Sequence, residues 1–124
     1  MRIQFLNLYT LQIIDKKQEK YKQKIFQLLQ QEVVGDDLDL RNLGFMTDLN
    51  NVKLVKENLD LSNTEITSLL KGLKVEGNLY LSDTPTTGLS ERLIVRENLY
   101  LKNTPISKNS ELIKKYKKLY KIIK

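Results

Sequence analysis

Three segments of nearly identical sequence decide the fold of this chain: VKENLDLSNTEIT at residues 55–67, VEGNLYLSDTPTT at residues 75–87 and VRENLYLKNTPIS at residues 95–107. The pair Leu59 and Leu61 returns every 20 residues, and an earlier stretch, VGDDLDLRN from Val34, holds a similar pair 21 residues upstream. A fixed period in the twenties is typical of a solenoid, in which each repeat adds one coil to a stack. The sequence therefore predicts an α/β solenoid of about four repeats.

The leucine pair of each repeat predicts a short strand. Leu59 and Leu61 alternate with Asp60, and successive side chains of a strand point to opposite faces. We therefore expect the leucines in the core and Asp60 outside. Thr64 follows at an inward position, where its hydroxyl can bond backbone groups of the turn, and threonine returns there in both later repeats.

An asparagine precedes the strand of each later repeat, at Asn58, Asn78 and Asn98, with Asp37 in the matching place of the first. Asparagine that recurs at one turn suits a left-handed or a side-chain-bonded backbone, so we interpret this column as structural. The carboxylate cluster that contains Asp37 and Asp39 is interpreted as a solvated turn, because no calcium-loop spacing follows it.

Residues 59–69 read Leu-x-Leu-x-x-Thr-x-Ile-x-x-Leu, a pattern that resembles the leucine-rich repeat, whose shortest, bacterial class has repeats of about this length. The resemblance covers about 70 to 75 of the 124 residues and implies a horseshoe. Threonine stands where that family has asparagine, and Val55 precedes Leu59 by four residues instead of three. Leu73 and Val75 also alternate, so each coil can carry two short strands. Two architectures therefore stay open: a leucine-rich-repeat-like horseshoe and a parallel β-helix.

We expect a single domain over residues 1–124. The repeats, at residues 33–109, lie between an N-terminal cap at residues 1–32 and a C-terminal basic helix cap at residues 110–124. Caps are expected because the end coils of a solenoid expose apolar faces and strand edges that need covering.

Both caps are expected to contain an amphipathic helix. Asp15 followed by Gln18 predicts the start of one helix, which runs to about Glu32. Ser110 is expected to cap the second helix. The apolar stripe of the second helix comprises Leu112, Tyr116, Leu119 and Ile123. The pattern of residues 2–14 allows a strand or a helix.

The chain contains no cysteine, histidine or tryptophan. This inventory excludes disulfides, thiolate and imidazole metal sites, and histidine-based catalysis, so we expect no enzyme activity, no metal and no cofactor. No small-residue cleavage site follows the N-terminus, and no apolar run approaches the ~20 residues that span a bilayer. We therefore expect a soluble, cytoplasmic protein without a membrane partner.

The net charge of +6 is unevenly placed. Residues 33–109 carry 9 Lys or Arg against 11 Asp or Glu, whereas residues 111–124 carry six lysines against Glu111 alone. The candidate contacts to phosphate or to an acidic surface are Lys114, Lys117, Lys118 and Lys121. Because no arginine fork accompanies these lysines, nucleic-acid contact is expected to be to phosphate, without base reading.

The outward column of the predicted strands reads Asp39, Asp60, Tyr80 and Tyr100, and the column beside it reads Arg41, Ser62, Ser82 and Lys102. This face therefore grades from acidic to aromatic and basic. Two tyrosines about 5 Å apart can form a protein-binding hot spot, or they can simply stack as a cross-strand pair, and both alternatives stay open. The predicted partner-binding residues are Arg41, Asp60, Tyr80, Tyr100 and Lys102.

The repeats favour a non-catalytic module that binds a macromolecular partner, most directly a protein, through the outward strand face. The alternative is a nucleic-acid or nucleoprotein binder that uses the C-terminal lysines. Short proteins rich in Lys, Ile and Asn with threonine-bearing leucine repeats are similar to proteins of bacteria and their phages. That resemblance implies a further alternative, a basic inhibitor of a host defence complex of the anti-CRISPR type, acting in the host cytoplasm. The sequence leaves the oligomeric state open.

Overall fold

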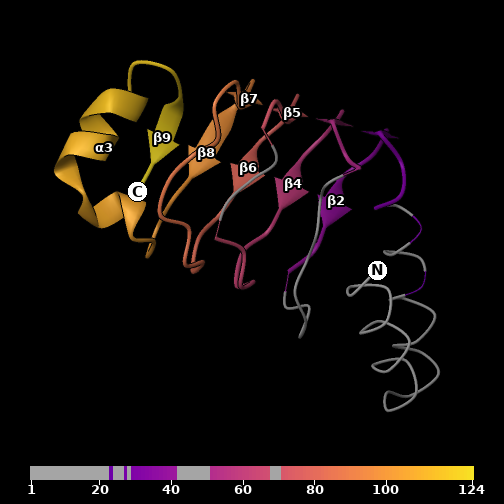
Figure 1. The fold of residues 1–124 in the computed structure, drawn as a ribbon, viewed down its shortest axis with the longest axis horizontal. Coiled ribbons are helices and arrows are strands. Elements are labelled where there is room, and N and C mark those ends of the chain that lie inside the picture. The colour runs from indigo at the N-terminus through magenta and orange to yellow at the C-terminus, as the bar shows by residue number, and fades with distance from the viewer. Residues whose placement is uncertain (1–22, 24–26, 28, 42–50, 68–70) are drawn as a thin grey trace, which may run out of the picture.

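The computed structural model describes residues 23, 27, 29–41, 51–67 and 71–124, and in these residues it contains two parallel sheets of short strands. Sheet A comprises β1 (Val33–Val34), β3 (Leu54–Val55), β5 (Lys74–Val75) and β7 (Ile94–Val95). Sheet B comprises β2 (Leu38–Asp39), β4 (Leu59–Asp60), β6 (Leu79–Tyr80), β8 (Asn98–Tyr100) and β9 (Lys121–Ile123). Figure 1 shows the strands of sheet B side by side in chain order, with helix α3 (Ser110–Tyr116) at the C-terminal end.

The register of both sheets follows the period of the sequence. In sheet B, Leu59 pairs with Leu38 on one side and with Leu79 on the other, and Leu79 pairs in turn with Leu99. In sheet A, the valine that ends each strand pairs with the valine that ends the next. Because every one of these pairs joins residues one repeat apart, each position of the repeat becomes a column of side chains that runs across the strands.

The inward columns form the core. One column comprises Leu38, Leu59, Leu79 and Leu99, none of which exposes more than 1% of its surface. The columns that begin with Val34 in sheet A and with Leu40 after β2 are buried beside it. Full burial of one such side chain contributes about 1.5–3 kcal/mol, so these columns supply most of the apolar stabilisation. The predicted alternation of buried leucine and outward residue 60 is confirmed.

The inward threonines hold the turn that follows each strand of sheet B. The Thr64 hydroxyl donates a hydrogen bond of 2.7 Å to the carbonyl of Leu61, and Thr84 and Thr104 repeat this bond at the same distance. The asparagine or aspartate before each threonine has a φ of 58° to 60°, a conformation that these two residue types tolerate better than most. The predicted role of the threonine hydroxyls is confirmed.

The asparagine column forms a ladder of bonds from side chain to backbone. Asn58 Oδ1 accepts from the N–H of Asn78 at 2.7 Å, and Asn78 Oδ1 accepts from the N–H of Asn98 at 2.9 Å. Asp37 begins the ladder, because its Oδ1 accepts from the N–H of Asn58 at 2.8 Å. The structural interpretation of this column is confirmed. Of the two backbone conformations that the sequence allowed, left-handed or bonded by side chains, the structure has the second, since none of these four residues has a positive φ.

The residue that caps helix α3 lies one position earlier in the chain than predicted. The side chain of Asn109 accepts from the N–H of Leu112 at 3.1 Å, so Asn109 caps the helix and Ser110 is its first residue. The helix contacts the short 3-10 helix η1 (Ile106–Lys108) and buries Ile113 and Tyr116 in the core.

The predicted C-terminal helix is wrong beyond Tyr116, where α3 ends. Leu119 is 68% exposed, and Ile123 lies in β9 instead of on an apolar helix stripe. The physical reason is the edge of sheet B. The backbone N–H of Leu101 needs an acceptor, and the carbonyl of Ile123 supplies it at 2.9 Å when residues 121–123 pair with β8.

Little of the predicted N-terminal cap falls within the described residues. Gln23 and Gln27 are helical, and Leu29 is buried and forms a turn with Gln30, so this helix ends before the predicted limit at Glu32. The remainder of the prediction for residues 1–28 lies outside the described residues. Among the helices of the described residues, none has the length and apolar character needed to cross a bilayer.

Candidate functional site

The outward side chains of sheet B form one surface of three columns and five strands, which we call the outer face. Its register pairs join Asp39, Asp60, Tyr80, Tyr100 and Ile123 into the central column. The outer face has one row of residues in or directly beside each strand. The rows are Asp37, Asp39 and Arg41 at β2, Asn58, Asp60 and Ser62 at β4, Asn78, Tyr80 and Ser82 at β6, Asn98, Tyr100 and Lys102 at β8, and Lys121 and Ile123 at β9. All of them are partly or fully exposed. The fold therefore brings all five predicted partner-binding residues onto one surface.

Tyr80 and Tyr100 stack at the centre of the outer face. Their ring centroids are 4.5 Å apart and the ring planes differ by 8°. The Tyr80 hydroxyl also accepts from Asn78 Nδ2 at 3.3 Å, so the ladder of asparagines helps to orient the ring. The two tyrosines therefore stack as a cross-strand pair, and both side chains stay partly exposed. Aromatic side chains held in this way present a large, rigid contact area.

Ile123 extends the tyrosine pair, and sequence reasoning missed it. The register places Ile123 directly beside Tyr100, with 44% of its surface exposed. The helical periodicity assigned to residues 110–124 concealed this position. A strand reading of residues 120–123 would have revealed it, because a strand points Tyr120 and Ile122 to one side and Lys121 and Ile123 to the other. The structure shows this alternation: residues 120 and 122 are partly buried, and residues 121 and 123 are exposed.

The acidic end of the outer face holds its own arginine. Arg41 Nη2 lies 2.8 Å from Asp39 Oδ2, and Arg41 Nε lies 3.0 Å from Asp39 Oδ1 and 3.3 Å from Asp60 Oδ2. The hydrogen bond from the Arg41 side chain lowers the pKa of Asp39 against the opposing effect of burial. Asp60 Oδ1 also accepts from the N–H of Ser62 at 3.0 Å. Two predicted contact residues, Arg41 and Asp60, are therefore engaged with each other.

The basic end of the outer face carries charges without such partners. Lys102, two residues after β8, and Lys121 on β9 are exposed, and neither forms an ion pair with any described residue. Their charges are thus available to a partner, unlike that of Arg41.

No known protein family, curated protein or solved structure matches this chain. The outer face combines a partly exposed aromatic centre, an internally paired acidic end and a basic end without ion pairs to described residues.

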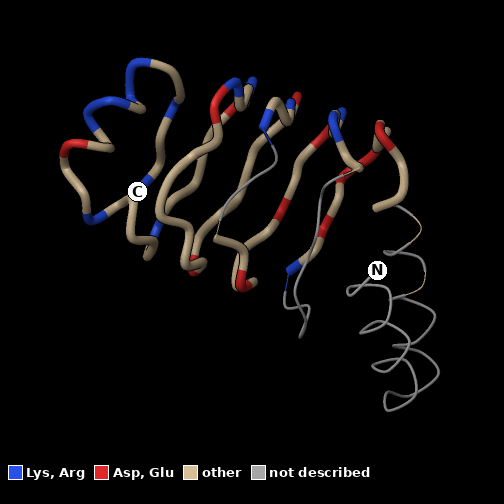
Figure 2. The backbone as a smooth tube through the Cα atoms, in the orientation of Figure 1, with Lys and Arg blue, Asp and Glu red and all other residues tan. Residues whose placement is uncertain are grey.

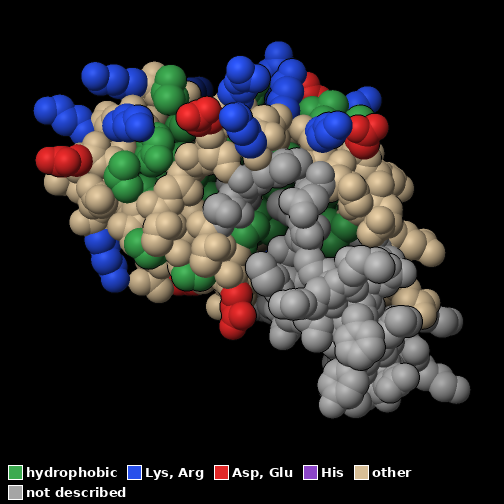
Figure 3. Space-filling model, viewed as in Figure 1, with side chains coloured by type: hydrophobic (Ala, Val, Ile, Leu, Met, Phe, Trp, Pro, Cys, Tyr) green, Lys and Arg blue, Asp and Glu red, His purple; other side chains and the backbone are tan. Residues whose placement is uncertain are grey.

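The C-terminal lysines lie on three elements instead of one helix. Lys114 belongs to the last turn of α3, Lys117 and Lys118 to the turn after it, and Lys121 to β9. Helix α3 and β9 lie together at one end of the molecule (Figure 1), where Figure 2 and Figure 3 show Lys and Arg, although both figures also show Lys and Arg along the upper edge of the other repeats. The predicted lysines therefore do not share a single helical face.

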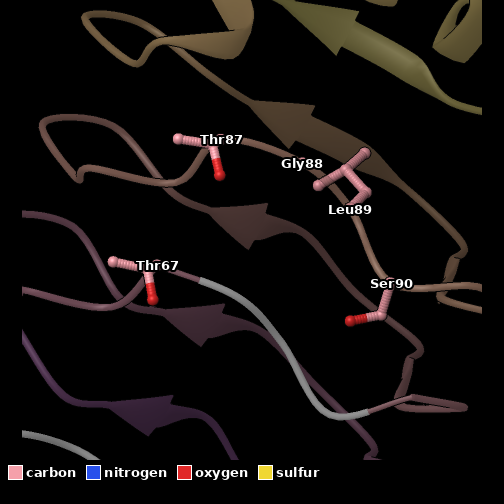
Figure 4. A pocket seen from close by; sticks show the side chains of 5 residues that line it. All are labelled: Thr67, Thr87, Gly88, Leu89 and Ser90. Carbon is pink, nitrogen blue, oxygen red and sulfur yellow. The ribbon is translucent and has the colours of Figure 1, made fainter.

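One hollow of about 200 Å³ opens on the return segments between the sheets. The described residues that line it are Thr67, Thr87, Gly88, Leu89 and Ser90. Figure 4 shows the side chains of Thr67 and Thr87 directed the same way from successive repeats. None of these five described residues has a side chain that titrates near neutral pH. Among the described residues, no group of three or more acidic side chains is placed to hold a metal ion.

Proposed function

We propose that this protein is a non-catalytic interaction module that binds a macromolecular partner, most directly another protein, through the outer face of sheet B. The observation that carries the proposal is the contrast between the two sides of the same strands. The inward column is leucine in β2, β4, β6 and β8, whereas the outward column changes from aspartate to tyrosine. Because the leucines maintain the stacking, the outward variation is not needed for the fold and is available for recognition.

The scaffold for this function is a short solenoid of the parallel β-helix type. Its support is the presence of two parallel sheets, since a leucine-rich-repeat horseshoe has one strand and a helical segment in each repeat. We propose α3 as the C-terminal cap. The hydroxyl of Tyr116 in α3 accepts from the N–H of Leu89 at 3.2 Å, which ties the helix to the preceding repeat.

The tyrosine pair suits recognition because it is already ordered. Stacking and the bond from Asn78 fix the two rings before any partner arrives, so binding loses little side-chain entropy. Ile123 adds apolar area beside Tyr100, and Lys102 supplies a charge at the margin. An apolar centre with a polar margin is the usual composition of a protein interface.

Site-directed photo-crosslinking tests the proposal. A photoreactive amino acid at Ser82, beside Tyr80 on the outer face, is expected to capture a defined protein from a lysate of the source cells. The same amino acid at Lys74, which lies in sheet A, is the matched control and should not capture it. The double substitution Tyr80→Ala with Tyr100→Ala should abolish the Ser82 product.

The double variant must also be shown to fold, because the stack contributes to the sheet. Urea denaturation should give a loss of about 1–2 kcal/mol for removal of one stacked aromatic pair. Undiminished capture by a folded double variant contradicts the proposal.

A second candidate function is polyanion binding by the C-terminal end. Residues 108–124 hold seven lysines against Glu111 alone, and none of the seven forms an ion pair with a described residue. Such an end attracts phosphate or the acidic surface of a nucleic-acid-bound complex. This arrangement also suits the alternative role of a basic inhibitor of such a complex.

Salt titration distinguishes this second candidate. Binding to a fluorescent DNA duplex should weaken steeply with salt, and changing Lys114, Lys117 and Lys121 to Gln should reduce the slope of log K against log salt by about 3. The matched control changes Lys53, Lys71 and Lys74 to Gln, which removes the same charge from residues on or near the middle strands of sheet A, β3 and β5. A flat salt response removes this candidate.

A further inference from the structure

The charges of the outer face are arranged antisymmetrically about its middle strand. The β2 row holds Asp37 and Asp39 against Arg41, which leaves a net charge of −1, and the β4 row has −1 from Asp60. The β6 row is uncharged. The β8 and β9 rows each have +1, from Lys102 and from Lys121.

We propose that the partner of the outer face is a second molecule of this protein, bound in a two-fold symmetric dimer. This inference rests on the function proposed for the outer face and names its partner. A two-fold interface places the same surface of both molecules together, so that surface must complement itself. From β2 to β9 the row charges are −1, −1, 0, +1 and +1. When a second copy faces the first in the reverse order, each charged row lies opposite a row of the other sign.

The strand order of sheet B decides which two-fold axis fits. An axis parallel to the strands and placed over β6 reverses the order, so β2 of one molecule faces β9 of the other and β4 faces β8. Each acidic row then meets a basic row. An axis perpendicular to the strands would place every row against itself, and like charges would repel. Electrostatics therefore selects the first axis.

The charged contacts between the acidic and basic rows match in chemistry as well as in charge, whereas Asp39, which is paired with Arg41, lies opposite Ile123. Asp60 on β4 lies opposite the β8 row, where Lys102 supplies an ammonium group and Tyr100 a hydroxyl donor. Asp37 and Lys121 belong to the same column and therefore meet across the dimer. Tyr80 lies on β6, at the axis, where the two copies of the ring come together. The result is an aromatic centre with charged margins.

The size of the outer face sets the expected affinity. Five strands spaced about 4.8 Å apart place β2 and β9 about 19 Å from each other, which is small for a protein interface. We therefore expect a reversible dimer with a dissociation constant of about 10–100 μM, in the range of transient complexes. Because its charge contacts are at the margin, association should weaken as salt rises.

Sedimentation equilibrium with a charge-swap series tests the dimer. Asp60→Lys alone and Lys102→Asp alone each place like charges opposite one another at both symmetric contacts, and each should weaken self-association at least about tenfold. An equimolar mixture of the two variants should associate again, because every contact in the mixed dimer then joins opposite charges. The double variant in one chain should recover for the same reason. Lys74→Asp, which changes the same charge in sheet A, should associate as the wild type does.

Two results would overturn the dimer. One is a wild-type protein that stays monomeric at low salt up to about 500 μM, well above the expected range. The other is self-association that both single variants retain, which would place the contact elsewhere. A monomer that still yields the Ser82 crosslink to another protein, dependent on Tyr80 and Tyr100, removes the dimer and leaves the proposed function intact. If instead the Ser82 crosslink is unchanged in the folded variant Tyr80→Ala with Tyr100→Ala, the proposed function itself is wrong.

Discussion

The hydroxyl of Tyr120 donates a hydrogen bond of 2.7 Å to the backbone carbonyl of Leu93. In the preceding repeats the equivalent carbonyls, those of Lys53 and Leu73, accept from the backbone N–H of the next strand of sheet A, each at 3.0 Å. Among the described residues sheet A has no strand after β7. A side chain from the segment that leads into β9 therefore replaces the backbone donor that another strand would supply.

Tyr120→Phe should destabilise the protein by about 1–2 kcal/mol, because it leaves the Leu93 carbonyl without its donor while keeping the ring. Urea denaturation followed by circular dichroism measures this loss. Leu119→Ala is the matched control: the side chain is 68% exposed, and its removal should change stability by less than about 0.5 kcal/mol. Equal losses in the two variants would mean that the hydrogen bond contributes nothing.

The same hydroxyl predicts a dependence of stability on pH. Burial, and secondarily the neighbouring Tyr116, raises the pKa of Tyr120 above its usual value of 10.0. The folded state thus favours the protonated hydroxyl more than the unfolded state does. Its contribution is complete below the unfolded pKa and is lost as pH rises through the folded pKa. The stability difference between wild type and Tyr120→Phe should stay constant up to about pH 9 and shrink above about pH 10.

Comparison with Tyr120→Phe at each pH removes the effect of lysines, which titrate in the same range. Tyrosinate absorbance provides an independent measure, because the Tyr120→Phe variant should lack an ionisation that the raised pKa of Tyr120 places above the usual value. A stability difference that grows above pH 10 would reverse the assigned sign.

Asn78→Ala should cost about 1 kcal/mol, since it removes the acceptor that the N–H of Asn98 uses at 2.9 Å. Asn78→Asp keeps that acceptor and should cost clearly less. The chain itself contains the precedent, because Asp37 accepts from the N–H of Asn58 at the equivalent position. Thermal or urea denaturation of both variants ranks them, and a more stable alanine variant would refute the ladder as a source of stability.

Arg92→Gly should stabilise the protein by about 0.5–1 kcal/mol. Arg92 has a φ of 62°, a left-handed conformation that costs a non-glycine residue about 1–2 kcal/mol, and Gly72 occupies the equivalent position one repeat earlier. Gly72→Ala is the reciprocal experiment. It should destabilise through backbone strain alone, because a Cβ at Gly72 would meet no atom within 4 Å. The same sign of change in both variants would exclude strain as the cause.

The periodicity of the sequence was sufficient to predict the central part of the fold. Leucines that recur every 20 residues can be buried together only if successive repeats pair in register, and Leu59, Leu79 and Leu99 do so. The inward threonines and the asparagine ladder were also predictable, because each belongs to one position of the repeat and has one local bonding task. Tyr80 and Tyr100 could be placed side by side for the same reason.

The C-terminal segment was not predictable in this way. Leu112, Tyr116, Leu119 and Ile123 have helical spacing, and local periodicity gives no reason to end the helix at Tyr116. The strand β9 forms because the edge of β8 presents unpaired backbone groups, a requirement that arises only once the sheet exists. Ile123 consequently joins the outer face instead of a helix stripe.

The sequence by itself therefore determined the repeat, its register and the residues that face inward and outward, because these depend on spacing along the chain. The tertiary structure alone decided three relationships. It engaged Arg41 with Asp60 of the next repeat, placed Ile123 beside Tyr100, and set the hydroxyl of Tyr120 against Leu93. Each of these satisfies a charge or a backbone group that becomes unpaired only when separate repeats, or the chain end, come together in space.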